Sequence, residues 1–353
     1  MTHLLAIAIT TLALALPCTL LDAQEQDASR PHDSFQIRHI TGDLYRSGNG
    51  AWHAIFLVTG AGAILVDPLN VEHANWLKDE LANRFDIPVK YVIYSHSHFD
   101  HAEGGAAFAD TATFIAHERM LANMDGRYPN MPGDMIDRNG NGLIDREDIM
   151  VPTDADPGIC GMSSNFFGQY DRDGDGVMTP AELQRDIVPP TVTYSDRMTI
   201  TLGGKTVELL HPGRNHGDDM TVVLFPQERV VFASDMIADA LVRDDIRSLP
   251  SACGPLDGHP IAEWIASYQA VLALDFDLFA GGHGDVFSKE ELTLPLRFLE
   301  DLERAVAQGL AQGLSLEQMQ RNILLEDYRN WAYYDRLRAK NIEAAYLNLS
   351  RLR

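Results

Sequence analysis

The chain has 353 residues, which is enough to bury a substantial core in one large domain or in one domain with an insertion. Its formal net charge of -23 excludes a nucleic-acid-binding surface built on excess basic residues, so we expect no nucleic-acid partner, although a metal can still hold a phosphate directly. With 45% hydrophobic residues, the composition is that of a folded protein rather than a disordered one.

The N-terminus carries an apolar run, Leu4 to Leu16, that is too short to span a bilayer comfortably and is typical of a signal peptide. Cleavage after Ala23 would remove residues 1–23. We therefore expect an exported protein, periplasmic or secreted, with no transmembrane segment in its mature form. Lipidation at Cys18 and retention of the run as an anchor are the two alternatives.

Two cysteines, Cys160 and Cys253, remain after this cleavage. In an exported protein they can form a disulfide, but two cysteines do not make a disulfide framework. Free buried thiols agree with the sequence at least equally well. Neither cysteine belongs to a metal-binding motif.

Residues 24–119 alternate between strand-like and helix-like patterns, which is typical of α/β architecture. The strand-like segments are short and apolar, whereas Trp76, Leu77, Leu81 and Phe85 fall at helical spacing. The predicted strands are 35–46, 54–59, 63–66, 91–94 and 111–116, and the predicted helices are 76–85 and 102–109.

Residues 120–190 differ in character, because they are rich in proline and in acidic side chains, and we interpret them as an insertion. The strand and helix pattern returns in residues 191–287, where Gly203-Gly204 predicts a two-residue hairpin turn. Residues 288–353 are helical in pattern, with an apolar stripe typical of core packing. The predicted strands after the insertion are 198–202, 205–210, 220–225, 229–233 and 276–280, and the predicted helix is 262–272.

The densest group of metal-competent side chains follows the predicted strand 91–94, and its members are His96, His98, Asp100 and His101. In an open α/β sheet, binding sites form at the carboxyl ends of strands. His96 and His98 share a side in strand-like geometry, whereas the other two residues follow on the turn. This spacing indicates two adjacent metal ions rather than one.

Three later segments each supply one more metal-competent side chain. His216, Asp235 and His283 all come shortly after a predicted apolar strand, among small residues that let the backbone approach closely. Because a two-metal site needs more ligands than one short cluster holds, we expect these residues to complete the set.

Together, these motifs resemble the metallo-β-lactamase fold of metal hydrolases, with H-x-H-x-D-H, a histidine near a Pro-Gly turn, an aspartate after a strand and a Gly-His in the family's order. The resemblance covers Phe35 to Phe287 outside the insertion and implies an α/β fold, a four-layered αβ/βα sandwich. It implies that a first zinc ion is held by His96, His98 and His216, and a second by Asp100, His101 and His283, with Asp235 bridging the two.

The aspartate at position 235 departs from the true β-lactamases of this fold, since class B3 members usually have no ligand there and the B1 type has a cysteine. Asp235 is instead similar to the glyoxalase, lactonase and phosphodiesterase branches, which weakens the case for a β-lactam substrate. Family members that bind two irons often carry Glu in place of the second histidine, so His98 favours zinc.

The resemblance implies a hydrolase in which two zinc ions share a bridging hydroxide, because coordination lowers the pKa of bound water from about 15.7 to about 7. Asp100 is expected to orient this hydroxide as well as to bind metal, which makes it a catalytic residue. The expected substrate is a small-molecule ester, lactone, lactam or thioester. Two alternatives remain open, an iron-dependent oxidoreductase on the same fold and a non-enzymatic calcium-dependent binding module. Nothing in the sequence indicates the oligomeric state.

The insertion contains two segments ordered like the calcium loop of an EF-hand, with oxygen-bearing side chains at positions 1, 3 and 5, glycine at 6, a backbone carbonyl at 7 and a carboxylate at 12. Pro129 and Pro132 leave no good entering helix before the first loop, which argues against a pair like those of calmodulin. We expect one or two calcium ions in a structural role. The predicted ligands are Asp171, Asp173, Asp175, Val177 and Glu182 in the stronger match, and Asp137, Asn139, Asn141, Leu143 and Asp148 in the weaker one.

Overall fold

The structure, a computed structural model, describes residues 35–48, 52–124, 140–145, 171–236, 241–243, 246–247, 249 and 260–351. The predicted signal peptide and the three cysteines, Cys18, Cys160 and Cys253, lie outside these residues. Among the described helices, none combines the length and the apolar character that a membrane crossing requires.

The first sheet consists of seven strands that lie in the order of the sequence, namely β1 (Gln36–Thr41), β2 (Leu44–Gly48), β3 (His53–Thr59), β4 (Gly62–Val66), β5 (Val89–Ile93), β6 (Thr113–His117) and β7 (Val192–Tyr194). Strands β1 to β4 are antiparallel neighbours, whereas β4 to β7 pair in parallel. The predicted strand 35–46 is two strands, because the chain turns at Gly42 with a φ of 55°. The last strand, β7, pairs with β6, although the acidic segment lies between the two strands in the sequence.

Helix α1 (Val71–Phe85) packs on the outer face of the first sheet through its buried apolar residues. It begins after Asn70, whose side chain accepts a hydrogen bond from the backbone N–H of His73 at 2.9 Å. It ends at Asp86, which adopts the left-handed conformation that often terminates helices. The predicted helix over 76–85 is thus confirmed and extends one turn further toward the N-terminus.

The predicted helix 102–109 forms as a single turn, α2 (Phe99–Ala102), followed by the 3-10 helix η1 (Glu103–Phe108). Glycine at positions 104 and 105 disfavours a regular α-helix. It also allows close packing, because a Cβ atom at Gly104 would lie 2.5 Å from the Cβ of Ala74 in α1. The tight turn therefore rests directly on α1.

The second sheet consists of six strands in the order β15-β14-β11-β10-β9-β8, namely β8 (Arg197–Leu202), β9 (Lys205–Leu210), β10 (Val222–Phe225), β11 (Val230–Ala233), β14 (Leu278–Gly281) and β15 (Val286–Ser288). The predicted hairpin between β8 and β9 is confirmed, because Leu202 pairs with Lys205 across the turn. Both turn residues have positive φ, 54° at Gly203 and 83° at Gly204, as a two-residue hairpin turn requires.

Helix α6 (Ile261–Leu272) connects the parallel strands β11 and β14. The C-terminal part is helical, as predicted, and helix α8 (Leu316–Asn322) begins with a capping box in which Ser315 and Gln318 bond each other's backbone N–H. The C-terminal elements are α7 (Thr293–Ala311), α8 (Leu316–Asn322), η4 (Glu326–Tyr328) and α9 (Tyr334–Ser350). The remaining short elements are α3 (Arg119–Asn123), α5 (Pro180–Leu183), β12 (Leu241–Arg243) and β13 (Ile246–Arg247).

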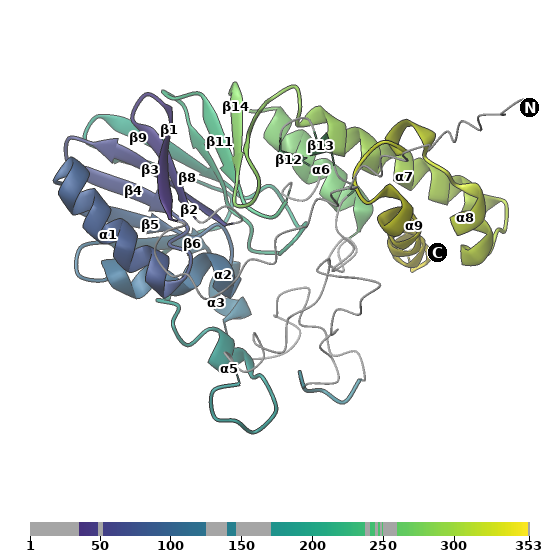
Figure 1. The fold of residues 1–353 in the computed structure, drawn as a ribbon, viewed down its shortest axis with the longest axis horizontal. Coiled ribbons are helices and arrows are strands. Elements are labelled where there is room, and N and C mark those ends of the chain that lie inside the picture. Colours follow the sequence, from purple (N-terminus) through teal and green to yellow (C-terminus); the bar gives the residue numbers. More distant parts are fainter. Residues whose placement is uncertain are drawn as a thin grey trace, which may run out of the picture. The chain divides into compact units, whose positions relative to one another are not determined.

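Three hydrophobic clusters hold these elements together as four layers. The middle cluster joins the two sheets and contains, for example, Leu57 of β3 and Phe225 of β10. Leu77 of α1 belongs to the cluster on the outer face of the first sheet, and Trp264 of α6 belongs to the cluster on the outer face of the second. The predicted four-layered αβ/βα sandwich is confirmed, with α1 on one side and α6 and α7 on the other (Figure 1).

Candidate metal centre

The seven predicted metal ligands all come from segments that follow strands. His96 and His98 lie in the loop after β5, and α2 carries Asp100 and His101. The other three, His216, Asp235 and His283, follow β9, β11 and β14 in the second sheet. The structure brings all seven side chains together in two groups.

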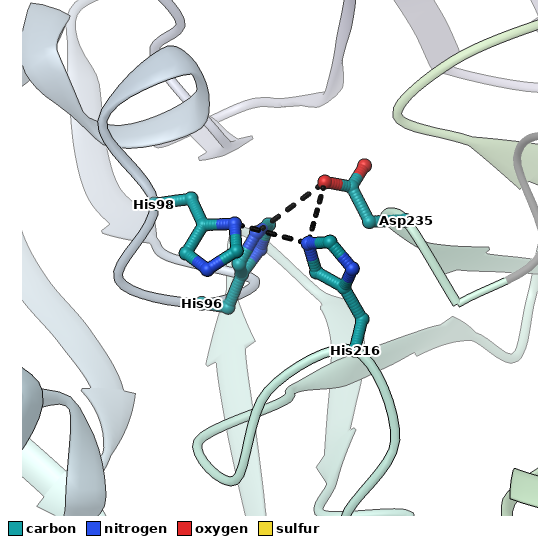
Figure 2. A group of neighbouring side chains, drawn as sticks. All are labelled: His96, His98, His216 and Asp235. Atoms are coloured by element: carbon teal, nitrogen blue, oxygen red, sulfur yellow. Dashed lines mark hydrogen bonds and ion pairs between the residues drawn. The ribbon is translucent and has the colours of Figure 1, made fainter. Parts of the chain in front are cut away.

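The first group consists of His96, His98, His216 and Asp235, each of which places one ligand atom within 4.8 Å of the others. Nδ1 of His98 lies 2.9 Å from Nε2 of His216. Figure 2 shows the three rings and the carboxylate turned toward one another. Desolvation lowers the pKa of His98 well below its ordinary value, and the neighbouring His96 and His216 lower it further. A neutral ring is the form of histidine that binds metal.

The second group consists of Asp100, His101, Asp235 and His283. Nε2 of His101 lies 3.3 Å from Nε2 of His283 and 3.5 Å from Oδ2 of Asp100. Burial opposes the charged form of His101 and His283, but the carboxylates of Asp235 and Asp100 together outweigh burial, and the pKa of both rings is raised. Without a bound cation, these rings therefore tend to carry the positive charge that balances the carboxylates.

Asp235 belongs to both groups, and its two oxygens are divided between them. Oδ2 lies 3.2 Å from Nε2 of His216 and 3.5 Å from Nε2 of His96. Oδ1 lies 3.0 Å from Nε2 of His283 and 3.2 Å from Nε2 of His101. Burial opposes ionisation of this carboxyl, but His101 and His283 hold its pKa well below the ordinary range. Asp235 is therefore an ionised carboxylate placed between the two groups.

The donor atoms fit zinc in spacing and in chemistry. Ligands about 2.0–2.2 Å from a tetrahedral zinc ion lie roughly 3.4 Å from one another, which is close to the distances found in both groups. Nε2 of His96 is buried and has no hydrogen-bond partner among the described residues, while Nδ1 of the same ring lies 2.9 Å from Oγ of Ser95. A buried ring nitrogen without a hydrogen bond is a group that a metal ion would satisfy.

Asp67 and Trp52 contact candidate ligands and were not predicted. Asp67 is fully buried after β4, where its Oδ1 accepts a hydrogen bond from Ser95 N–H at 2.8 Å and its Oδ2 lies 3.4 Å from Nδ1 of His101. Nε1 of Trp52 donates a hydrogen bond to Oδ2 of Asp100 at 3.1 Å. An acidic residue directly after a buried strand is a signal that could have identified Asp67, whereas no local pattern marks Trp52.

The turn that carries His283 is held by the first sheet. The guanidinium of Arg46 in β2 is buried, donates a hydrogen bond to the backbone oxygen of Gly284 at 2.6 Å and lies 3.7 Å from the carboxylate of Asp285. The backbone N–H of His53 in β3 donates to the oxygen of Gly282 at 2.7 Å. Backbone and side-chain contacts between the sheets thus position one ligand of the second group.

The predicted calcium ligands lie in the acidic segment between β6 and β7. Asp171, Asp173 and Glu182 come together, with one carboxylate oxygen of each within 4.8 Å of the others. Asp175 and Val177 belong to the same loop. Of the residues predicted for the other loop, Asn141 and Leu143 are described, whereas Asp137, Asn139 and Asp148 lie outside the described residues.

Two curated proteins are similar in sequence. The chain is 22% identical over 288 residues to the 2,4-dinitroanisole O-demethylase subunit alpha of Nocardioides sp. (strain JS1661), a match that covers 80% of this chain and 68% of that protein. It is 23% identical over 250 residues to the linear primary-alkylsulfatase of Pseudomonas sp. (strain ATCC 19151), covering 68% of this chain and 43% of that protein. The chain therefore spans less than half of the alkylsulfatase's length.

Solved structures agree with the fold. The metallo-beta-lactamase from Pontibacter korlensis gives a TM-score of 0.51 at 16% identity, covering 75% of this chain and 99% of that one. The metallo-beta-lactamase FIM-1 from Pseudomonas aeruginosa, in its mono-zinc form, gives 0.52 at 13% identity, covering 77% and 97%. At these identities, the likeness establishes the fold alone.

The sequence profile of the metallo-beta-lactamase superfamily matches residues 50–283, which is more than half of the chain. This stretch contains all seven residues of the candidate metal centre and the strands, in both sheets, that these residues follow. The motifs, the four layers and the profile agree, and the chain belongs to the metallo-beta-lactamase superfamily.

Proposed function

We propose that this chain is a dinuclear zinc hydrolase that acts on a small-molecule ester, lactone, lactam or thioester. The observation that carries the proposal is the division of the Asp235 oxygens, Oδ2 toward His216 and Oδ1 toward His283. One carboxylate with a separate ligand group at each oxygen is suited to bridge two ions. The first ion would be held by His96, His98 and His216, the second by Asp100, His101 and His283, with Asp235 shared.

Zinc is the metal that this donor set favours. Five imidazoles and two carboxylates provide nitrogen and oxygen donors, which suit zinc better than the hard cations that prefer oxygen alone. When bound, two zinc ions would supply a water-derived nucleophile near neutral pH and positive charge to polarise the bond that is cleaved. No serine or cysteine nucleophile is then required.

The side chains differ in exposure, which indicates where a substrate reaches the centre. The side chains of His96 and His101 are 0% exposed, whereas that of Asp100 is 28% exposed and that of His283 is 25% exposed. We therefore place the substrate on the side of Asp100 and His283.

Asp100 is the residue that we assign to orienting the attacking water. Its Oδ2 receives the hydrogen bond from Trp52 and faces His101. This bond fixes the carboxylate plane, so that the carboxylate can accept a hydrogen bond from water in a defined direction. Trp52 acts through Asp100 and is a positioning residue.

The names of the two curated relatives extend the set of substrates that should be tested. One name refers to the O-demethylation of 2,4-dinitroanisole and the other to linear primary alkyl sulfates. A substrate panel should therefore include 2,4-dinitroanisole and a linear primary alkyl sulfate beside chromogenic carboxylic ester, lactone, lactam and thioester compounds.

The test combines metal analysis with this panel on the full chain. We expect two zinc ions per chain by plasma mass spectrometry and hydrolysis of at least one compound. Asp235→Asn keeps the shape of the side chain but removes its charge, so it should lower bound zinc to at most one ion. Its kcat/KM should fall by more than the roughly 10–100-fold that changes outside a ligand set cost.

Asp110→Asn is the matched control, because Asp110 is an exposed aspartate that pairs only with Lys78 among the described residues. It should keep both zinc content and activity. Iron with visible absorption in place of zinc would contradict the metal assignment. Two bound zinc ions without turnover of any compound would contradict hydrolysis and favour a binding protein.

A further inference from the structure

We propose that residues 171–182 form a calcium site that fastens the acidic segment to the first sheet. The site shares no residue with the proposed zinc centre. Asp171, Asp173 and Glu182 each place a carboxylate oxygen within 4.8 Å of the others. They occupy positions 1, 3 and 12 of the loop, and the carboxylate of Asp175 and the backbone carbonyl of Val177 stand at positions 5 and 7.

A buried and unpaired oxygen within this group points to a cation. Asp171 is only 8% exposed, and its Oδ1 has no hydrogen-bond partner among the described residues. Its Oδ2 accepts a hydrogen bond from Gly176 N–H at 3.2 Å. A carboxylate oxygen that is removed from water and left unpaired costs free energy, and two further carboxylates nearby add repulsion. A bound cation would remove both costs.

The backbone of the loop fixes the other carboxylates. Asp173 accepts a hydrogen bond from Asp175 N–H at 3.1 Å, and Asp175 accepts one from Val177 N–H at 2.8 Å. Glu182 accepts from Arg172 N–H at 3.0 Å and from Thr179 N–H at 2.8 Å. Because these bonds hold the side chains without a cation, binding requires little further ordering.

The same loop is joined to the other described piece of the acidic segment. Asp145 and Val177 form an antiparallel bridge, and Met178 N–H donates to the oxygen of Ile144 at 2.8 Å. Ile144 and Met178 are the eighth residues of the two predicted loops, and both are buried in the cluster that covers the outer face of the first sheet. The described parts of the two loops are thus joined by backbone contacts and by burial in one cluster.

The end of the loop is attached to the sheet as well. Leu183 and Ile187, which follow Glu182 within five residues, are buried in the same cluster. The amide of Gln184 donates to the backbone oxygen of Asn123 at 2.9 Å, and the amide of Asn123 donates to Asp218 at 3.0 Å, two residues after His216. Calcium at the loop would therefore stabilise a segment that reaches the neighbourhood of the zinc centre.

Calcium suits this site better than zinc, because every donor is an oxygen. A twelve-residue loop of this kind surrounds the ion with several oxygen ligands. The loop contains no histidine or cysteine. Loops of this kind in extracellular modules bind calcium at about 10⁻⁴ to 10⁻³ M, so the test must cover this range.

The experiment uses the full chain, loaded with zinc and freed of calcium by gel filtration. Equilibrium dialysis with calcium chloride should show one saturable calcium ion per chain, and calcium should raise Tm by roughly 3 °C or more. Asp171→Asn and Glu182→Gln should each weaken binding at least about tenfold, because affinity depends on the number of charged ligands. Glutamine at position 182 can keep the capping box with Thr179, so a purely structural role of Glu182 would leave the calcium affinity unchanged.

Asp186→Asn is the matched control, since Asp186 is an acidic residue just outside the loop that pairs with Arg172. It should bind calcium as the unaltered chain does. His96→Ala should also bind calcium normally, which separates this site from the zinc centre. Absence of binding in this range, or an unchanged calcium affinity in Glu182→Gln, would overturn the proposal.

Discussion

His73 shows how one buried side chain makes stability depend on pH. His73 belongs to the first turn of α1, and its buried ring donates from Nδ1 to the backbone oxygen of Pro68 and accepts at Nε2 from Oγ of Ser47, both at 3.1 Å. These two bonds satisfy both nitrogens of the neutral ring. Burial lowers the pKa of His73 from its ordinary 6.5 to about 4, and the bond to Pro68 offsets only part of this.

Between pH 6.5 and about 4, the unfolded chain binds a proton at His73 that the folded chain does not. The contribution of His73 to the free energy of unfolding is therefore fully present above pH 6.5. It is lost as the pH falls through this window, by up to about 3 kcal/mol. His73→Gln should show a shallower loss over the same window, measured by urea unfolding at several pH values. Equal slopes for both chains would show that His73 does not contribute.

Spacing along the sequence predicted the candidate ligands that the structure brings together, but not the residues that contact them. The group from His96 to His101 was visible because its members lie within one turn, where spacing alone decides which side chains can converge. Trp52 contacts Asp100 across 48 positions, and Asp67 contacts Ser95 across 28. Such pairs follow from the order of strands in a sheet, which no local pattern specifies.

At the scale of elements, the second ligand group depends on the position of the turn between β14 and β15, which carries His283. Gly282 packs against the end of β11, because a Cβ atom there would overlap the side chain of Ser234 and lie 2.9 Å from Cε1 of His101. The turn has no free space in which to move away, since Arg46 and His53 hold it from the first sheet.

Gly282→Ala should displace either His101 or His283 and so weaken zinc binding in the second group, with a loss of activity of roughly 10–100-fold. Gly60→Ala is the control, because no atom lies within 4 Å of a Cβ atom built there. Zinc titration and steady-state kinetics on both variants would check this. Full zinc content in Gly282→Ala would contradict this, because it would mean that the turn can shift to accommodate a Cβ atom without displacing a ligand.

Periodicity predicted the regular elements well and the irregular ones poorly. Strands with continuous apolar runs, such as β4 and β11, and the amphipathic α1 were predicted because burial imposes their pattern. The 3-10 turn η1 was expected as part of a helix, since only the close approach of Gly104 to Ala74 and of Gly105 to Tyr94 shows why two glycines stand there. The short pair β12 and β13 carries too few residues for a pattern to emerge.

For the whole molecule, the candidate centre is a link between two sheets. Its ligands follow β5 in the first sheet and β9, β11 and β14 in the second, so bound zinc would tie the two halves of the sandwich together. A metal that binds the folded chain and not the unfolded one stabilises it by mass action. The four layers were predicted correctly, but this mechanical role depends on side-chain positions that the sequence does not specify.

Removal of zinc by a chelator should therefore lower Tm by about 5 °C or more, as measured by differential scanning calorimetry. Asp235→Asn should bind less zinc, so we expect a smaller difference in Tm between its zinc-loaded and zinc-depleted forms. The reason is that the shared carboxylate contributes to both ligand groups. Identical melting curves with and without zinc would contradict a stabilising role.

The position of β7 has a consequence for the order of folding. This strand completes the first sheet beside β6, yet the acidic segment separates the two in the sequence. Closing such a long loop costs chain entropy, and any contact made early inside the loop reduces that cost. The bridge between Asp145 and Val177 is a contact of this kind. We expect amides of β7 to become protected from hydrogen exchange after those of β2 to β5 during refolding, and sooner when calcium is present.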